Sequence, residues 1–211
     1  MKKPIRNIAV VAGAASAAFA LTLSPATAAP STVWTVSPNP ANITAVNSGN
    51  IVLSVNGLNI TCTRSTGLAM LRSATGNPAV VGSVDALAFG ATGAPCTSAL
   101  GPMTMTPVTP WAVLAQDHDA TTGVTKGHLD RVDIKMNAGP IVFRVKGKVA
   151  YTYTNTTGRL TVTSAPGQLL VTESANGGVA LPVGSSLIGT GTYLVKAAGT
   201  TTGPAIIGTH P

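Results

Sequence analysis

The stretch LDRVDIKMNAGPIVFRVKGKVAYTYTNTTGRLTV, residues 129–162, decides the fold. Between residues 141 and 154, apolar and polar side chains alternate along the chain. The apolar set comprises Ile141, Phe143, Val145, Val149, Tyr151 and Tyr153, and the polar set comprises Arg144, Lys146, Lys148, Thr152 and Thr154. Because successive side chains of a strand point to opposite faces, this period of two predicts a half-buried antiparallel strand. Gly147 interrupts the apolar set and predicts a bulge or a close backbone contact.

The segments on either side of this strand continue the same pattern. Val132, Ile134 and Met136 alternate with charged residues and predict a preceding strand. The sequence Asn-Thr-Thr-Gly at residues 155–158 predicts a turn, because Asn and Gly accommodate turn conformations readily. Apolar residues at positions 160 and 162 then predict a returning strand.

The rest of the chain adds short β-prone runs separated by Gly and Pro. These runs cover residues 33–36, 51–55, 58–64, 80–89, 103–106, 111–115, 169–172 and 192–196. Asn56-Gly57 between two of them predicts a tight hairpin. No helical pattern occurs after the first 28 residues. We therefore expect an all-β fold, with a single antiparallel β-sandwich or barrel over residues 29–198 and a loose tail over residues 199–211.

The first 28 residues have the pattern of a cleaved secretory signal peptide. Lys2, Lys3 and Arg6 precede an apolar run, and Ala26-Thr27-Ala28 supplies the small residues of a cleavage site. The apolar run is short for a membrane span, which needs about 20 residues. We therefore expect a secreted, extracellular protein with no transmembrane segment after cleavage.

Charge and cysteine content narrow the function classes further. Loss of the leader removes three of the 13 basic residues and leaves 10 against six acidic residues, a net charge of +4. This excess is too small to indicate a nucleic acid partner. Cys62 and Cys96 are the two cysteines of the chain. An even number of cysteines behind a signal peptide predicts a disulfide bond between them.

A cluster of His and Asp residues is the first candidate site. Asp117, His118, Asp119, His128 and Asp130 place two imidazoles and three carboxylates within 14 positions, a set that could bind a divalent metal. If Val132 faces the core, the alternation places His128 and Asp130 on that same face at the rim of the fold. The alternative interpretation is a solvated polar loop, because no established metal-ligand spacing is present.

A row of cations is the second candidate site. Arg144, Lys146 and Lys148 on the polar face of the strand, with Lys135 beside them, could bind a polyanion such as a cell-wall polymer. The alternative is a solvated face on which charge opposes aggregation. Catalytic patterns are absent from the sequence: it contains no G-x-S-x-G motif, and with one Glu among six acidic residues a glycosidase carboxylate pair is hard to assemble.

Several motifs resemble those of a known protein family. In chain order they are Leu58-Asn-Ile-Thr-Cys62, Cys96, Pro107-Val-Thr-Pro-Trp111, the segment YTYTNTTGRLTV at residues 151–162, and Gly189-Thr-Gly-Thr-Tyr193. This series resembles an uncharacterised family of actinobacterial secreted, β-rich proteins and, more distantly, secreted proteins described as activators of alkane oxidation. Members often carry a second cysteine pair, which is missing here at residues 138–139 and 177–178. The resemblance implies no activity, cofactor or catalytic residue.

The sequence thus favours a secreted, non-catalytic extracellular protein that acts as a structural or binding module and needs no cofactor. A cell-wall polymer or another extracellular protein is the partner that such a module would meet. The alternatives are a polyanion-binding protein that uses the cation row, a metal-dependent hydrolase that uses the residue 117–130 cluster, and an accessory protein for an apolar substrate. The last of these requires an apolar cavity or an exposed apolar patch.

Overall fold

The computed structural model describes residues 31–91, 93–176 and 181–210. The predicted leader, residues 1–28, lies outside the described residues. Within them the chain is built from strands and connecting turns, which confirms the all-β prediction. No helix in this part of the chain is long and apolar enough to span a membrane.

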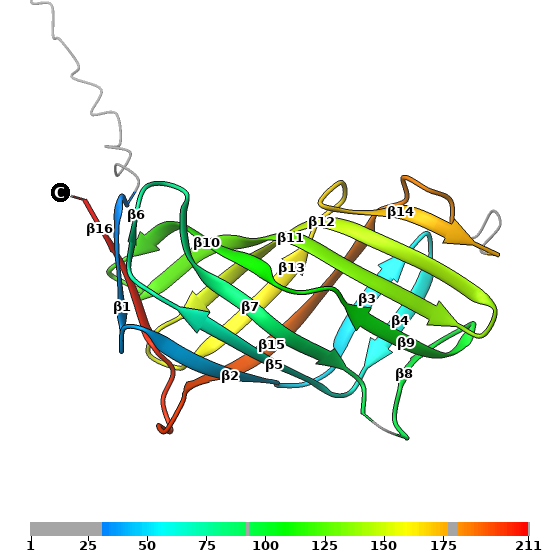
Figure 1. Ribbon diagram of the computed structural model, residues 1–211, viewed down its shortest axis with the longest axis horizontal. Helices are drawn as coiled ribbons and strands as arrows, with labels where there is room; N and C mark the ends of the chain where they lie inside the picture. Colours follow the sequence, from blue (N-terminus) through cyan, green and yellow to red (C-terminus); the bar gives the residue numbers. More distant parts are fainter. Residues whose placement is uncertain (1–30, 92, 177–180, 211) are drawn as a thin grey trace, which may run out of the picture.

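The strands form an elongated barrel whose wall runs up and down in chain order (Figure 1). Eight antiparallel wall segments can be traced in the described residues, and five of them consist of two strands in tandem. They are β2 (Ala41–Asn47) with β3 (Ile51–Val55), β4 (Leu58–Cys62) with β5 (Ser65–Leu71), β7 (Ala79–Phe89) with β8 (Cys96–Ser98), β9 (Gly101–Pro107) with β10 (Trp111–Asp119), β11 (Val124–Ala138), β12 (Ile141–Thr154), β13 (Arg159–Ser164) with β14 (Leu169–Ala175), and β15 (Leu187–Ala197).

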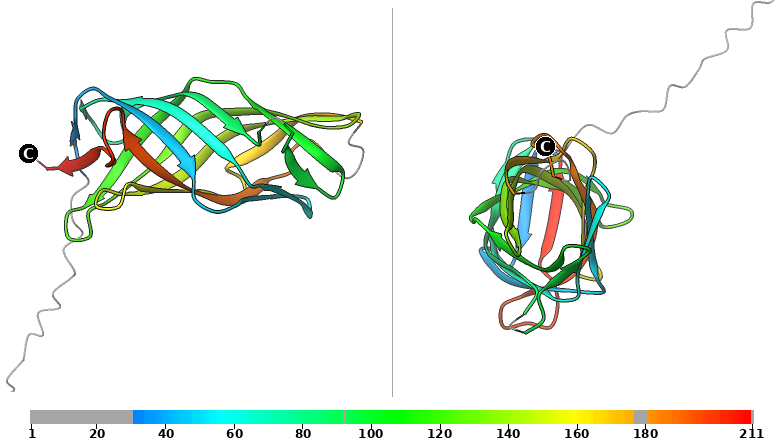
Figure 2. Two further views of the ribbon diagram at one scale, coloured as in Figure 1. Left: turned by 90° about the horizontal axis from the view of Figure 1, so that it is seen from below. Right: turned by 90° about the vertical axis from the view of Figure 1, so that its right-hand side faces the viewer.

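Pairing between the last wall segment and the first closes the barrel. β15 pairs antiparallel with β2 from Tyr193 to Ala197 and with β3 from Leu187 to Thr190. An end-on view shows the closed ring (Figure 2, right). The sequence left sandwich and barrel open, because the pairing that decides between them joins strands more than a hundred residues apart. A barrel of about eight strands has an interior wide enough for packed side chains or for one small ligand.

A small second sheet covers one end of the barrel. It consists of β16 (Ala205–Thr209), β1 (Val33–Ser37) and β6 (Ala74–Thr75), and we call it the end cap (Figures 1 and 2). The prediction of a loose tail over residues 199–211 is therefore wrong for residues 205–209. β16 pairs along the whole of β1, and Ile206 is buried.

Hydrogen bonds from Thr125, Tyr153 and Asn155 hold β16 in place. The side chain of Asn155 bonds both backbone groups of Ile206, accepting from the N–H at 2.6 Å and donating to the carbonyl at 3.0 Å. The Tyr153 hydroxyl donates to the carbonyl of Pro204 at 2.7 Å. Thr125 donates to the same Ile206 carbonyl at 2.7 Å. The Gly- and Thr-rich composition of the tail does not indicate these hydrogen-bond partners, because they lie far away in the sequence.

The predictions made for the strand at residues 141–154 are confirmed. β12 has the predicted bounds, and Phe143, Val145, Tyr151 and Tyr153 are buried. Gly147 has a φ of 148°, and a Cβ there would collide with the Gln168 carbonyl on the chain leading to β14. A glycine is therefore required at this close contact. The Asn56-Gly57 hairpin is also present, with positive φ at both residues and Val55 paired to Leu58.

Two clusters of buried side chains occupy the two ends of the barrel. The disulfide core surrounds Cys62 and Cys96 and includes Ile60, Met103 and Phe143. The cap core lies beneath the end cap and includes residues of the cap itself as well as of the wall: Trp34, Val36, Val81, Tyr151, Tyr153 and Ile206.

Candidate functional site

Three strands contribute small side chains to the wall around the middle of the barrel. Ala45 of β2, Gly67 and Ala69 of β5, and Gly189 and Gly191 of β15 all border the interior. These three strands are neighbours in the wall. A packed core needs side-chain volume from every wall segment, and these positions supply little of it. A cavity remains between the two cores.

The cavity is almost entirely apolar. It offers about 150 Å³ to the centre of a water-sized sphere, where about 10–15 Å³ suffices for one water molecule. Its lining reaches from Ile51, Phe89 and Leu187 near the disulfide core to Val113, Tyr151 and Ile206 near the cap core. The cavity is therefore elongated along the barrel. No Asp, Glu, Lys, Arg or His belongs to the lining within the part of the chain described.

Exposure of inward-facing side chains supports the presence of open space. Val84, Leu129, Leu160 and Val162 contact both cores, yet each is only partly buried. In a filled barrel, apolar side chains on the inner face would be buried on all sides. The sequence predicted that positions 160 and 162 belong to the apolar face, which the structure confirms, but the partial exposure of these side chains within the barrel was not predictable from alternation.

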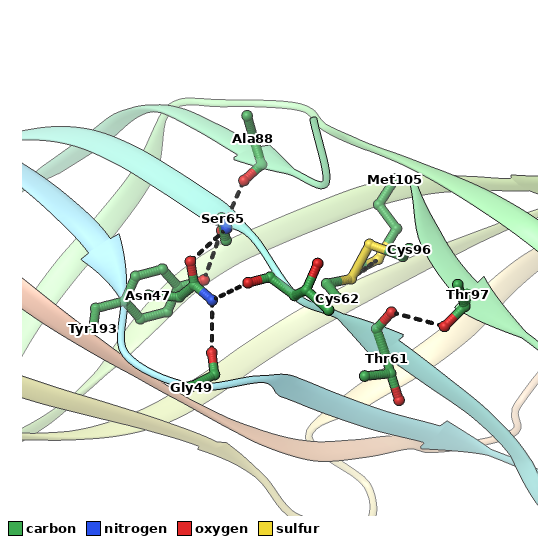
Figure 3. The surroundings of a disulfide bond; sticks show 11 residues. Asn47, Gly49, Thr61, Cys62, Ser65, Ala88, Cys96, Thr97, Met105 and Tyr193 are labelled. Atoms are coloured by element: carbon green, nitrogen blue, oxygen red, sulfur yellow. Dashed lines mark hydrogen bonds between the residues drawn. A yellow bond between two sulfur atoms is a disulfide. The ribbon is translucent and has the colours of Figure 1, made fainter. Parts of the chain in front are cut away.

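All three tyrosines of the chain line this cavity, and two of them have hydrogen-bond partners. Tyr153 donates to the carbonyl of Pro204. Tyr193 lies 3.0 Å from the Ser65 hydroxyl, which itself donates to Ala88, so Tyr193 is the donor of this pair (Figure 3). Burial raises the pKa of Tyr153 and of Tyr193 to about 12 each.

Tyr151 differs from the other two. Its ring lies across Gly127 of β11, where a Cβ would approach the hydroxyl oxygen to 2.8 Å. Its hydroxyl is buried and has no hydrogen-bond partner among the described residues. Burial raises the pKa of this hydroxyl well above its ordinary value, so it stays protonated and able to donate.

The Cys62–Cys96 disulfide is present and joins β4 to β8 (Figure 3). Both cysteines are buried, and the Met105 sulfur lies 3.5 Å from that of Cys62. The bond therefore belongs to the packing of the disulfide core. It borders the end of the barrel rather than the cavity.

The predicted metal cluster does not assemble. Val132 and Leu129 both face the interior, because a bulge lies between them and Arg131 adopts a φ of 59°. This extra residue shifts the inward–outward alternation by one position, so the residues before it face the opposite side from the one predicted. The expectation that His128 and Asp130 share the core face of Val132 is therefore wrong. His128 bonds to the side chain of Gln116 at 3.1 Å, and Asp130 borders a shallow depression on the outer surface.

The remaining members of that cluster have separate roles. His118 faces inward beneath the end cap and bonds to Thr125 at 2.9 Å, and desolvation lowers its pKa despite the nearby carboxylates. Asp117 is exposed. Asp119 accepts hydrogen bonds from Thr121 and Thr122 in the β10–β11 turn, which lowers its pKa. No group of three or more His, Cys, Asp or Glu residues in the described chain could hold a metal ion.

The cation row lies on the outer face of β12, as alternation predicted, but acidic neighbours accompany it. Arg144 forms two 2.7 Å contacts with the Asp133 carboxylate and a 3.4 Å contact with Glu173, and the Asp133 bond raises the pKa of Arg144. Lys146 lies 3.9 Å from the same Asp133. A polyanion would have to compete with these carboxylates. Lys148 is exposed, and polyanion binding by the row stays a prediction.

Sequence reasoning assigned Tyr151 to the inner face but missed the cavity itself. One signal was available, since Ala45, Gly67, Ala69, Gly189 and Gly191 occur in segments with β alternation. These small residues leave a cavity only because β2, β5 and β15 are adjacent in the barrel. No local sequence pattern predicts that adjacency. Comparison with protein-family models, curated proteins and solved structures gave no match to this chain.

Proposed function

We propose that this protein is a secreted, non-catalytic binding protein that holds an apolar small molecule in the interior of its barrel. The motifs of the chain also resemble, more distantly, secreted proteins described as activators of alkane oxidation, and an apolar ligand is consistent with that resemblance. The proposal combines two of the functions considered from sequence, the binding module and the accessory protein for an apolar substrate.

The observation that carries the proposal is the partial exposure of inward-facing apolar side chains around the cavity. Leu129, Leu160 and Val162 contact both cores and still retain accessible surface inside the barrel. Removing apolar surface from water stabilises a complex by about 25 cal/mol per Å². An apolar ligand would bury this surface together with its own, whereas water in the cavity would find few polar partners.

The position of the site within a rigid wall also suits binding. The lining residues come from paired strands of the barrel, and both ends of the cavity adjoin buried cores. Such a pocket is formed before the ligand arrives, which reduces the entropy lost on binding.

The test measures binding of the uncharged fluorophore N-phenyl-1-naphthylamine, whose emission increases in apolar surroundings. Ala69 lines the cavity, and Ala69→Leu adds volume inside the barrel. Ala86 lies on the neighbouring strand β7 and is exposed, so Ala86→Leu is the matched control. We expect saturable binding to the native protein and to the control, and roughly tenfold or more weaker binding to Ala69→Leu.

Thermal unfolding of both variants checks that each one folds. Equal binding by the two leucine variants would contradict the proposal, because the fluorophore would then occupy the outer surface. Failure of the native protein to bind the fluorophore and other uncharged apolar compounds would contradict it as well.

A further inference from the structure

The outer surface of the barrel carries an apolar patch on three neighbouring strands, β15, β2 and β5 (Figure 1). Val46 of β2 and Leu194 of β15 are direct cross-strand partners and are 53% and 43% exposed. Leu68 of β5 is 54% exposed and pairs with Thr44, which places it diagonally next to Val46. Met70 extends the patch along β5 and is also exposed. We call Val46, Leu68, Met70 and Leu194 the wall patch.

Four cationic side chains border the wall patch. Arg159 of β13 is the cross-strand partner of Leu194, and Lys196 follows Leu194 by two positions on the same face of β15. Arg64 and Arg72 immediately precede and follow β5. All four cations are exposed, and none has an ion pair or a side-chain hydrogen bond within the described residues.

Acidic residues are scarce on this side of the barrel. β13, β15, β2 and β5 are consecutive in the wall and contain no Asp or Glu. Asp85 lies on the next strand, β7, where it accepts a hydrogen bond from Ser83. The outer face of β11 and β12 differs, because Arg144 and Lys146 there both contact Asp133. The positive charge around the wall patch therefore lacks the compensation that the cation row has.

The shape and charge of the wall patch together select its partner. The patch lies on the convex outer face of paired strands, whereas a small molecule needs a concave site. A lipid bilayer accepts apolar side chains between its headgroups, and it leaves the charged ends of Lys and Arg at the level of the phosphates. Anionic lipids add an attraction for each cation near the surface. A second copy of the chain would instead bring the same unpaired cations against the first set.

We propose that the wall patch docks the protein on the surface of an anionic lipid bilayer. Val46, Leu68 and Leu194 enter the headgroup region, and the four bordering cations lie beside lipid phosphates. The charged outer face of β11 and β12 stays in water, so the contact is confined to one side of the barrel. Apolar small molecules partition into bilayers, and docking would bring the cavity close to a store of them. The docking itself does not depend on a ligand in the cavity.

The experiment measures co-sedimentation of the protein with vesicles of phosphatidylcholine alone and of phosphatidylcholine mixed with an equal amount of phosphatidylglycerol. We expect the native protein to bind the anionic vesicles roughly tenfold or more tightly than the neutral ones. The double variant Val46→Thr/Leu194→Thr should bind the anionic vesicles roughly threefold to tenfold more weakly. The matched control Val108→Thr/Leu170→Thr alters two exposed apolar side chains outside the wall patch and should bind like the native protein.

A second pair of variants tests the cations. Arg159→Gln/Lys196→Gln removes the two charges beside Leu194, whereas Lys126→Gln/Lys148→Gln removes two exposed charges from β11 and β12. Both variants have the same net charge. The first should weaken binding to anionic vesicles roughly tenfold, and the second should weaken it much less. Added salt should weaken the binding of the native protein, because it screens the attraction between the cations and the lipid.

The native protein decides the question first: if it does not bind anionic vesicles, the inference is wrong whatever the variants do. Equal losses in the two glutamine variants would overturn it as well, because net charge alone would then be responsible. So would equal losses in the two threonine variants. A dimer in analytical ultracentrifugation that is lost in Val46→Thr/Leu194→Thr would overturn it by showing that a second copy covers the patch.

Two features make the comparison specific. All the proteins have the same N-terminus, so differences between them report on the altered side chains, and thermal unfolding checks that each variant folds. The vesicles contain no added apolar ligand. Failure of docking would therefore leave the proposed function intact, and failure of ligand binding would leave docking intact.

Discussion

The two ends of the barrel are closed by different chemistry. At one end, a covalent bond between Cys62 and Cys96 joins two wall strands within a core of aliphatic, methionine and aromatic side chains. At the other end, hydrogen bonds from Tyr153 and Asn155 attach the C-terminal strand β16 to the wall. Each end is well packed, and the middle between them is not. We therefore expect the two packed ends to supply most of the stability, and the proposed ligand site lies in the middle between them.

Removal of the disulfide should have the largest effect on stability. The bond closes a loop with a sequence separation of 34, for which the chain-entropy model gives a contribution of about 4 kcal/mol. Cys62→Ser should lower the free energy of unfolding by roughly 2–5 kcal/mol, measured by denaturant titration. Reductant should lower the stability of the native protein and leave the variant unchanged. A native protein with two free thiols in mass analysis would contradict the assignment.

Loss of the Asn155 side chain should have an intermediate effect, confined to the cap end. Asn155→Ala removes two hydrogen bonds to Ile206 and one to Gly123, and should cost about 1–3 kcal/mol. Hydrogen exchange should accelerate at the β16 amides and remain slow in β4 and β8. Asn59, which is exposed on β4, supplies the control Asn59→Ala. If β16 keeps its protection in Asn155→Ala, the cap is held by other contacts.

Protonation of His118 should have the smallest effect, again at the cap end. Desolvation lowers the pKa of His118 below its ordinary value of 6.5, so the unfolded chain takes up this proton first as the pH falls. The contribution of His118 to stability is therefore complete above about pH 6.5 and is lost as the pH falls toward the lower folded pKa. The free energy of unfolding should decrease slightly between pH 7 and pH 5.

The matched variants are His118→Gln and Asn59→Ala. The first should flatten the dependence of stability on pH, and the second, which removes no titratable group, should preserve it. An identical pH dependence in all three proteins would exclude His118 as the titrating group.

Sequence reasoning recovered what depends on neighbours in the chain. The bounds of β12, the Asn56-Gly57 hairpin and the turn after Thr154 follow from alternation and turn chemistry, and the structure agrees with each. The disulfide followed from there being a single possible pairing. These features need no knowledge of the strand order.

What sequence reasoning missed depends on distant partners. The β2 segment has a strand-like composition, but no local pattern in the sequence predicts its pairing with β15, which closes the barrel. β16 is held by Asn155 and Thr125, which are far away in the chain. The bulge at Arg131 places a non-glycine residue at positive φ, which composition does not favour, and it reversed the predicted orientation of His128. The cavity is space that no side chain fills. It exists only where strands with small side chains are adjacent in the barrel.

The most direct test of the account is the location of a bound apolar molecule by nuclear magnetic resonance. Protein with labelled methyl groups is saturated with N-phenyl-1-naphthylamine, and intermolecular nuclear Overhauser effects are recorded from the aromatic protons of the fluorophore. Binding inside the barrel predicts effects to the methyl groups of Leu129, Leu160 and Val162, which line the cavity. It predicts none to Val46 and Leu194, a cross-strand pair exposed on the outer surface. Effects to Val46 and Leu194 without any to the cavity methyl groups would contradict the central claim that the barrel interior is the binding site.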